Sequence, residues 1–386
     1  MPVFHQMADK SQNLLDDQHL GEYVGAVISP VNYTEEETLG YMKRLRMRSD
    51  GSFSFVLDPQ LYFPGSEEGQ LPGWRFFPSQ FRSGDYTSAK YWTDIAKNVA
   101  TVGKDLHAQY VASPAVVPKV YDNSYFELMT TVATSFADHA DDRFEPMQSL
   151  IVSTRDLAAT PERAMIVASI VGATACKWIY LMLDTDVRPR LELSDAERLF
   201  AVMKLISVLE RAGKRVLVGY TSSDVLLWKT AGATACATGK FFNVRRFTRS
   251  RFEDKEEGGG NLPYWFEESL LAFVRAADLK RLKVEKVLSN ATVRNPLAED
   301  VLLAIEKDVA WVKLSWVAYM WWFADVEKRL SSGDTKAKDL FKIAQQVWTK
   351  LDRHDVYMSE RLNTGEWIQA WLQADADFRK WRDALS

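Results

Sequence analysis

Short apolar segments that alternate with helical segments restrict the fold of this chain more than any other feature of its sequence. The runs SLIVST (149–154), KWIYLML (177–183) and KRVLVGYT (214–221) are each followed by residues with helical periodicity. These runs are apolar on both faces, which is typical of parallel strands that are covered by helices. A repeated strand–helix order predicts an α/β fold built on a parallel sheet.

Seven strand candidates can be placed along the chain. They lie at 23–30, 52–59, 108–118, 149–154, 177–183, 214–221 and 233–239. The run LLAFV (270–274) is a candidate eighth strand, although it follows helix-like residues. Seven or eight strand–helix units over about 260 residues fit a (β/α)8 TIM-like barrel, which is the fold we expect.

A doubly wound open parallel sheet is the alternative to the barrel. Such a sheet would place a glycine-rich phosphate loop after its first strand, but ISPVNYTEEE (28–37) contains neither G-x-G-x-x-G nor a Walker pattern.

The sequence also marks the ends of two predicted helices. Thr34 is the expected N-cap of a helix over 34–49, and Ser194, with Glu197 and Gly213, predicts a capped helix over 194–213.

The periodicity also predicts the domain organisation. Residues 1–20 are polar and are expected to form a lead-in, and residues 21–280 are expected to form the barrel. After residue 275 only helical periodicity remains, so residues 281–386 are predicted to be a C-terminal helical domain.

Composition limits the classes of partner. The net charge is −4, so affinity for phosphate or nucleic acid must come from a local patch. The two cysteines, Cys176 and Cys236, have no zinc-site or disulfide spacing. No apolar run reaches the ~20 residues of a membrane helix, and the N-terminus does not resemble a secretory signal. We therefore expect a cytoplasmic protein without membrane contact.

Two aspartates directly follow predicted strands, where the active site of a barrel lies. Asp58 follows FVL and Asp184 follows YLML, and a partly desolvated carboxylate at such a place can act as an acid, a base or a nucleophile. Asp186 is either a second carboxylate of a pair or a partner of Arg188. The alternative is that these aspartates start turns or cap helices. Other strand ends supply the expected substrate contacts, namely Asn32, Tyr62, Arg155, Asp156 and Tyr220.

A basic segment follows the last predicted strand. The sequence KFFNVRRFTRSR (240–251) carries five cations and alternates them with aromatic residues. Many barrels bind phosphate in this region, and arginine matches phosphate oxygens with two parallel hydrogen bonds. Lys240, Asn243, Arg245 and Arg246 are therefore predicted to clamp an anion. The alternatives are solvated surface charge and salt bridges to the acidic run at 253–257.

The sequence gives weaker indications of a cofactor or a protein partner than of the aspartates and the basic segment. The five histidines are scattered and none lies at a predicted strand end, so we expect neither a histidine-rich metal site nor a catalytic triad. No cofactor motif is evident, and a divalent metal held by carboxylates is left open. The tryptophan-rich helical stretch 311–323 is expected to pack on the rest of the chain, with a protein-partner surface as the alternative.

These features predict an enzyme that acts on a phosphate-bearing ligand, either a nucleotide or a nucleic acid. Asp58 and Asp184 would perform acid/base or nucleophilic chemistry on a glycosidic or phosphoester bond, as in a hydrolase or a glycosyl transferase. The alternative is a non-catalytic barrel that binds nucleic acid or a protein partner within a larger assembly. Convergence of the two carboxylates in one pocket beside the arginines favours the enzyme, whereas the use of either carboxylate in a local cap or salt bridge favours the binding protein.

Overall fold

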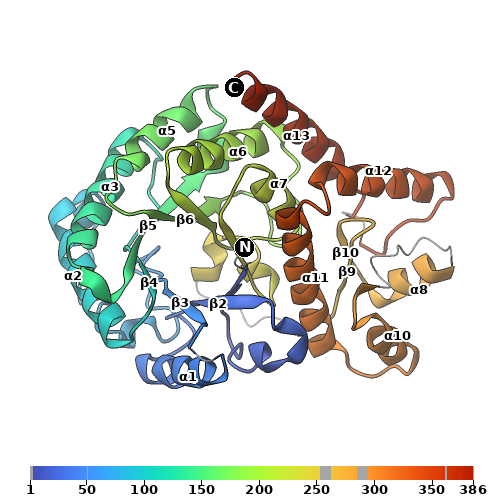
Figure 1. Ribbon diagram of the computed structural model, residues 1–386, viewed down its shortest axis with the longest axis horizontal. Coiled ribbons are helices and arrows are strands. Elements are labelled where there is room, and N and C mark those ends of the chain that lie inside the picture. The colour runs from blue at the N-terminus through green and yellow to red at the C-terminus, as the bar shows by residue number, and fades with distance from the viewer. Residues whose placement is uncertain (1–2, 50, 253–261, 285–293, 361–362, 386) are drawn as a thin grey trace.

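A computed structural model describes residues 3–49, 51–252, 262–284, 294–360 and 363–385, and its centre is a closed parallel barrel (Figure 1). Each strand pairs with its neighbours in sequence order, and β8 pairs with β1 to close the barrel. The strands are β1 (Val3–Gln6), β2 (Tyr23–Ile28), β3 (Ser54–Leu57), β4 (Tyr110–Ala112), β5 (Glu145–Ser153), β6 (Trp178–Asp184), β7 (Arg215–Val218) and β8 (Ala235–Thr238). The TIM-like barrel is confirmed, and the open sheet is wrong because no strand of this barrel is left with a free edge.

The strand that closes the barrel is β1, within residues that we expected to be a lead-in. It pairs in parallel with both β2 and β8. The sequence VFHQ is only four residues long and half polar, so it gives no apolar run that would predict a buried strand. The candidate at 270–274 lies outside the barrel. Its residues form β10 (Ala272–Val274), which pairs antiparallel with β9 (Trp265–Glu267).

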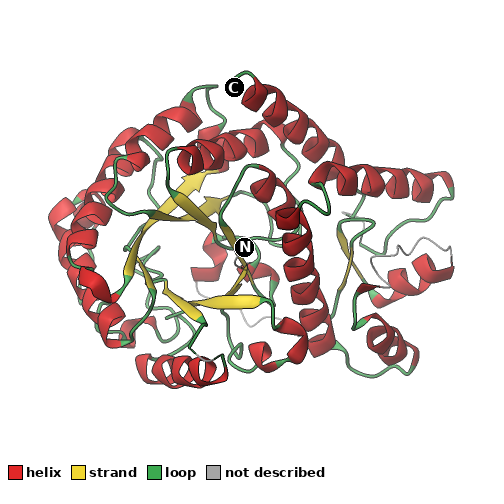
Figure 2. Cartoon of the chain, in the orientation of Figure 1, coloured by secondary structure: helices red, strands yellow, loops and turns green. Residues whose placement is uncertain are grey.

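Helices surround the barrel, as Figure 2 shows. They are α1 (Glu35–Arg48), α2 (Ala89–Asp105), α3 (Asn123–Asp138), α4 (Thr154–Leu157), α5 (Arg163–Gly172), α6 (Ala196–Arg211) and α7 (Val225–Thr230). The predicted N-cap at Thr34 is confirmed, and it is part of a capping box, since its side chain and that of Glu37 accept from each other's backbone N–H groups. The cap of α6 is Asp195 and not the predicted Ser194, because the Asp195 carboxylate accepts from the Arg198 N–H group.

Among the described residues after 262, the regular elements are helices apart from the strands β9 and β10. Their helices are α8 (Ala276–Val284), α10 (Ala298–Glu306), α11 (Val312–Ser332), α12 (Ala337–Arg353) and α13 (Trp367–Asp383). In Figure 1, α11 lies beside the barrel near β2, and α13 lies beside α6. The aromatic side chains of Tyr319, Trp322 and Phe323 on α11 are buried, and the Trp322 ring centroid lies 3.9 Å from that of Phe266 on β9.

A buried ion pair joins α11 to the barrel. Lys229 Nζ on α7 lies 2.9 Å from Glu327 Oε1 on α11, and the two side chains are 5% and 1% exposed. The Lys229 ammonium also donates to the backbone oxygen of Ala233 at 2.9 Å. Desolvation makes each charge dependent on the other, since an unpaired charge at this depth is strongly unfavourable.

We predict that Glu327→Ala lowers the free energy of unfolding by about 3 kcal/mol, because it leaves the Lys229 ammonium buried without its counter-ion. The double variant Lys229→Met/Glu327→Leu should recover most of this loss, since it removes both charges and keeps the volume. Chemical denaturation of the three proteins measures the difference. Equal stability of Glu327→Ala and the wild type would contradict the assigned role.

Candidate active site

Asp58 lies at the barrel mouth, the face formed by the carboxyl ends of the strands, and directly follows β3. Its side chain is fully buried. Asp58 Oδ1 accepts hydrogen bonds from the Tyr62 hydroxyl at 2.6 Å and from the Gln60 N–H group at 3.0 Å. Asp58 Oδ2 lies 3.3 Å from the Tyr180 hydroxyl, which also lies 3.2 Å from Gln6 Oε1.

Burial raises the pKa of Asp58 to about 6, although the hydrogen bonds from Tyr62, Gln60 and Tyr180 and the charge of Arg251 act in the opposite direction. A carboxyl with this pKa exchanges a proton near neutral pH. Burial and the negative charge of Asp58 in turn raise the pKa of Tyr62 and of Tyr180 well above the usual value, so both phenols remain donors.

The geometry of Tyr180 also allows a protonated Asp58. Its single hydroxyl proton can serve only one of its two acceptors, Gln6 Oε1 and Asp58 Oδ2. When Asp58 Oδ2 carries the proton, it can donate to the Tyr180 oxygen while Tyr180 donates to Gln6. Gly219 makes room for this ring, since a Cβ atom there would lie 2.5 Å from Tyr180 Cε2. Both protonation states of Asp58 therefore have a hydrogen-bonded arrangement.

Two residues beside Asp58 have a left-handed backbone. Gln60 and Tyr220 each have φ of 53°, a conformation that is uncommon for residues other than glycine. They are joined by a hydrogen bond of 3.2 Å from Gln60 Nε2 to the Tyr220 oxygen. Backbone strain of this kind is concentrated at functional sites, where the surroundings hold it in place. The strain therefore marks the neighbourhood of Asp58.

Arg251 provides a buried cation near Asp58. Its Nη2 atom donates to Asn32 Oδ1 at 3.1 Å and lies 3.3 Å from Ser29 Oγ. The Ser29 hydroxyl also lies 2.9 Å from Gln60 Oε1. Arg251 Nε is buried and has no hydrogen-bond partner within the described part of the chain. A buried guanidinium N–H group without an acceptor is a candidate ligand contact.

An aromatic cover, formed by Tyr62, Tyr220, Phe247 and Phe252, encloses Asp58. The Phe247 centroid lies 5.2 Å from that of Tyr62 and 5.4 Å from that of Tyr220, and Phe252 lies 5.2 Å from Tyr62. All four side chains are buried. The basic segment (residues 240–251) thus lies at the barrel mouth, and its Phe247 contributes to the low polarity that raises the pKa of Asp58.

Asp184 and Asp186 after β6 are both used in ion pairs. Asp184 Oδ2 accepts from Arg249 Nη2 at 2.6 Å and from the Tyr121 hydroxyl at 2.7 Å. Asp186 is about half exposed and pairs with Arg155 and with Arg198 rather than with the predicted Arg188. Of the two, Asp184 is the one that the structure buries at the mouth.

The remaining predicted substrate contacts divide into two groups. Asn32, Tyr62 and Tyr220 lie around Asp58 and Arg251, as described above. Arg155 is largely exposed and contacts Asp186, and Asp156 pairs with Arg163 at 2.9 Å. Arg155 therefore belongs to a surface ion pair, and Asp156 belongs to a largely buried ion pair with Arg163.

Two members of the predicted anion clamp are bound by the protein itself. Arg245 Nε and Nη2 donate to the backbone oxygens of Gly239 and Lys240 at 2.8 Å, and its guanidinium lies 3.6 Å from the ring centroid of Tyr319. Lys240 Nζ donates to the Lys10 oxygen at 3.0 Å and lies over Trp316. Burial lowers the pKa of Arg245 to about 10 and that of Lys240 to about 8.

Arg246 lies between two buried acids. Its Nη2 and Nη1 atoms are each 3.6 Å from a carboxylate oxygen, of Glu192 and of Asp224 respectively. Burial raises the pKa of Glu192 to about 7 and also raises the pKa of Asp224, although the charge of Arg246 acts in the opposite direction on both. Arg246 Nε and Asn243 Oδ1 are buried and find no hydrogen-bond partner among the described residues. The acidic run at 253–257 lies outside those residues.

Several of these groups were not singled out from the sequence. Gln6 lies on β1, which was not recognised, and Tyr180 lies in the middle of an apolar strand. Tyr180 carries the only hydroxyl in the run 177–183, and an isolated phenol in a barrel strand was the available signal. Glu192 could not be assigned, and Arg251 was recognised only as one cation of the basic segment, because their partners are distant in the sequence.

Within the described residues, no group of three or more histidines, cysteines, aspartates and glutamates could hold a metal ion. In the same part of the chain, the structure has no helix that is both long and apolar enough to cross a membrane.

No model of a known protein family matches the chain, and no curated protein matches it. Solved structures align with it at low similarity. A type I 3-dehydroquinate dehydratase from Clostridium difficile is 7% identical, with a TM-score of 0.34, over 65% of this chain and 88% of that one. A homocysteine methyltransferase from Escherichia coli is 11% identical, with a TM-score of 0.33, over 62% of this chain and 90% of that one. An L-ribulose 3-epimerase is 12% identical, with a TM-score of 0.35, over 66% of this chain and 84% of that one. These values carry no argument about activity.

We predict that Asp58→Asn stabilises the protein at high pH. An unfolded aspartate loses its proton near pH 4, whereas folded Asp58 keeps its proton up to about pH 6. The folded state therefore binds more protons in this window, and its stability falls as the pH rises through it. Asparagine resembles the neutral carboxyl, so the variant should be more stable than the wild type above pH 7, by on the order of 2 kcal/mol.

Chemical denaturation between pH 4 and pH 8 measures this difference, which should vanish at the acidic end. Asp186→Asn is the matched control, because that half-exposed carboxylate lies outside the aromatic cover. A constant difference between Asp58→Asn and the wild type across the range would contradict the raised pKa.

Proposed function

We propose that this chain is an enzyme in which Asp58 transfers a proton to or from a polar substrate at the barrel mouth. The observation that carries the proposal is a fully buried carboxyl with a pKa of about 6, held by two phenols beside two strained residues. A purely structural aspartate at a strand end has no need of this combination. Proton transfer by such a group contributes about 10²–10⁴-fold to a reaction rate.

The bond class that suits this centre is one with an oxygen leaving group, such as a glycosidic or phosphoester bond. A protonated Asp58 can donate to the leaving oxygen, and the ionised form can accept a proton from an attacking water. Asp184 would be the second carboxylate, with its position fixed by Arg249 and Tyr121.

A phosphate on the substrate would be held by Arg251 and Arg246 rather than by Lys240 and Arg245. The Nε–H groups of Arg251 and Arg246 are without a partner among the described residues, whereas Arg245 and Lys240 donate to backbone oxygens. Guanidinium groups also match phosphate geometry better than an ammonium does. A nucleotide is a substrate of this class.

Reaction at Asp58 requires the aromatic cover to move. Phe247 and Phe252 are held in place by their neighbours Arg249, which binds Asp184, and Arg251, which binds Asn32. A substrate that competes for these arginines would release the cover at the moment of binding. Motion of such a segment commonly excludes water from the reaction.

The non-catalytic alternative receives support from Asp184, because its carboxylate is used in an internal ion pair. Asp58 does not follow this pattern, since its hydrogen-bond partners are two phenols and a backbone N–H group. The enzyme is therefore the function that the geometry supports best.

The test is an untargeted search for turnover. Wild-type protein, Asp58→Asn and Asp186→Asn are each incubated with a cell metabolite extract and with a total RNA pool, and substrate loss is followed by mass spectrometry. We expect at least one compound to be consumed by the wild type and by Asp186→Asn, with a rate at least about 100-fold lower for Asp58→Asn. Rates against pH should show a midpoint near 6, the pKa of Asp58.

Full turnover by Asp58→Asn would remove this residue from the mechanism. If the wild type consumes nothing in either mixture and yet retains a bound compound through purification, the non-catalytic barrel is favoured instead.

A further inference from the structure

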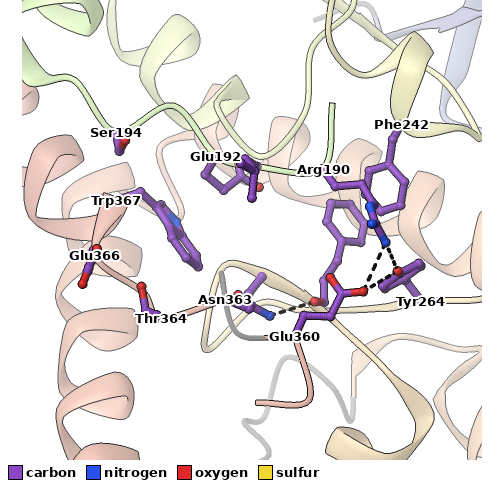
Figure 3. Close-up of a pocket in the computed structure, with 13 residues that line it drawn as sticks. Arg190, Glu192, Ser194, Phe242, Tyr264, Glu360, Asn363, Thr364, Glu366 and Trp367 are labelled. Carbon is purple, nitrogen blue, oxygen red and sulfur yellow. Dashed lines mark hydrogen bonds and ion pairs between the residues drawn. The ribbon is translucent and has the colours of Figure 1, made fainter. Parts of the chain in front are cut away.

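A pocket whose lining does not include Asp58 lies between the barrel and the C-terminal helices (Figure 3). One wall comes from the residues after β6, including Arg190 and Glu192, and another comes from residues 363–367 at the start of α13. Phe242, Tyr264 and Phe273 supply aromatic surface. Its volume is about 160 Å³, far more than the roughly 10–15 Å³ that one water molecule requires.

Two buried polar groups of this pocket lack hydrogen-bond partners in the described part of the chain. They are Glu192 Oε2, an acceptor whose ion-pair partner Arg246 Nη2 lies 3.6 Å away, beyond hydrogen-bond distance, and Trp367 Nε1, a donor. The Glu192 side chain is 7% exposed, and its other oxygen accepts from the Ser223 hydroxyl at 2.7 Å. In Figure 3 these two residues come from different walls, and the Trp367 ring projects toward the space between them. A molecule that offers a donor to one wall and an acceptor to the other would satisfy both.

The charges of the pocket favour a neutral ligand. The Glu360 carboxylate is bound by Arg190 at 3.1 Å and by Arg275 at 2.9 Å, and Glu192 faces Arg246. An anion in this pocket would be repelled by the carboxylates of Glu192, Glu360 and Glu366. Among the described residues around the pocket it would find no free cation to offset this repulsion, because the nearby arginines already pair with Glu192 and Glu360.

A cationic ligand is disfavoured for a different reason. Arg275 lies 4.5 Å from the centroid of Tyr264, and Arg245 lies over Phe242 and Phe273. The aromatic faces that would attract a cation are therefore occupied by arginines of the protein.

We propose that this pocket binds a small neutral molecule that has a flat ring and an amide-like group, with a donor and an acceptor side by side. The aromatic walls accommodate the ring, and Glu192 and Trp367 bind the amide-like group. This proposal does not depend on the chemistry at Asp58, although Arg246, which faces Glu192 in this pocket, is also proposed above to hold a substrate phosphate.

Three probes with one ring and different head groups test the proposal. Benzamide is neutral and carries both a donor and an acceptor, benzoate is the anion, and benzamidinium is the cation. The full-length protein is labelled with ¹⁵N in its 13 tryptophan indoles, and Trp367→Phe identifies the Trp367 signal. We expect benzamide to shift this signal saturably, with weaker binding of benzoate and of benzamidinium.

Two variants measure the contribution of each wall. Glu192→Gln and Trp367→Phe should each weaken benzamide binding by about tenfold, the usual cost of losing one buried hydrogen bond. The binding of Trp367→Phe is followed on the ligand signals, so this arm does not depend on the indole resonance. Glu306→Gln and Trp381→Phe are matched controls outside the pocket and should bind as the wild type does.

Three results would overturn the proposal. The first is the absence of a saturable shift with benzamide up to about 10 mM, where even millimolar affinity is visible. The second is binding of benzoate or benzamidinium as tight as that of benzamide. The third is unchanged benzamide affinity in both Glu192→Gln and Trp367→Phe.

Discussion

The need to compensate buried charge at the barrel mouth determines most of the structure around it. A charge removed from water is costly unless it is paired or hydrogen-bonded. Of the four arginines after β8, Arg245, Arg246 and Arg251 are buried and meet this requirement in different ways, and the half-exposed Arg249 meets it for the buried carboxylate of Asp184. Arg245 uses backbone oxygens and a Tyr319 ring, Arg246 lies between two acids, Arg249 binds Asp184 and Arg251 binds Asn32. A chain of net negative charge thus concentrates cations where its buried polar groups require them.

Asp58 is a buried carboxyl that is not paired with a cation of the described chain, and its raised pKa follows from burial without a direct ion pair. Its hydrogen bonds come from Tyr62, Gln60 and Tyr180, and within the described residues no arginine or lysine donates to it directly. Desolvation therefore outweighs stabilisation of the anion, and the pKa rises to about 6. Asp184 is also buried at the mouth, yet it has Arg249 as a direct partner. Two buried aspartates at the ends of barrel strands thus differ because only Asp184 has a cation as a direct partner in the part of the chain that the structure describes.

The sequence predicted the fold better than the site. Alternating apolar and helical runs were enough for the barrel, and Thr34 marked its first helix, because these signals are local. β1 was missed since VFHQ carries no apolar run. The partners of the basic segment could not be predicted from local patterns, because Arg249 and Asp184 are 65 residues apart and Arg251 and Asn32 are 219 apart. Only the closed barrel brings these side chains together.

The most direct test of the account is the titration of Asp58 itself. Protein labelled with ¹³C at the aspartate side-chain carboxyl carbons is titrated by NMR, and the Asp58→Asn spectrum identifies the signal. The account predicts a midpoint near pH 6 for this carbon, because the aromatic cover and the lack of a direct cation keep the carboxyl protonated in mildly acidic solution. A midpoint at or below the usual aspartate value near 4 would contradict it, since Asp58 would then be an ordinary structural carboxylate.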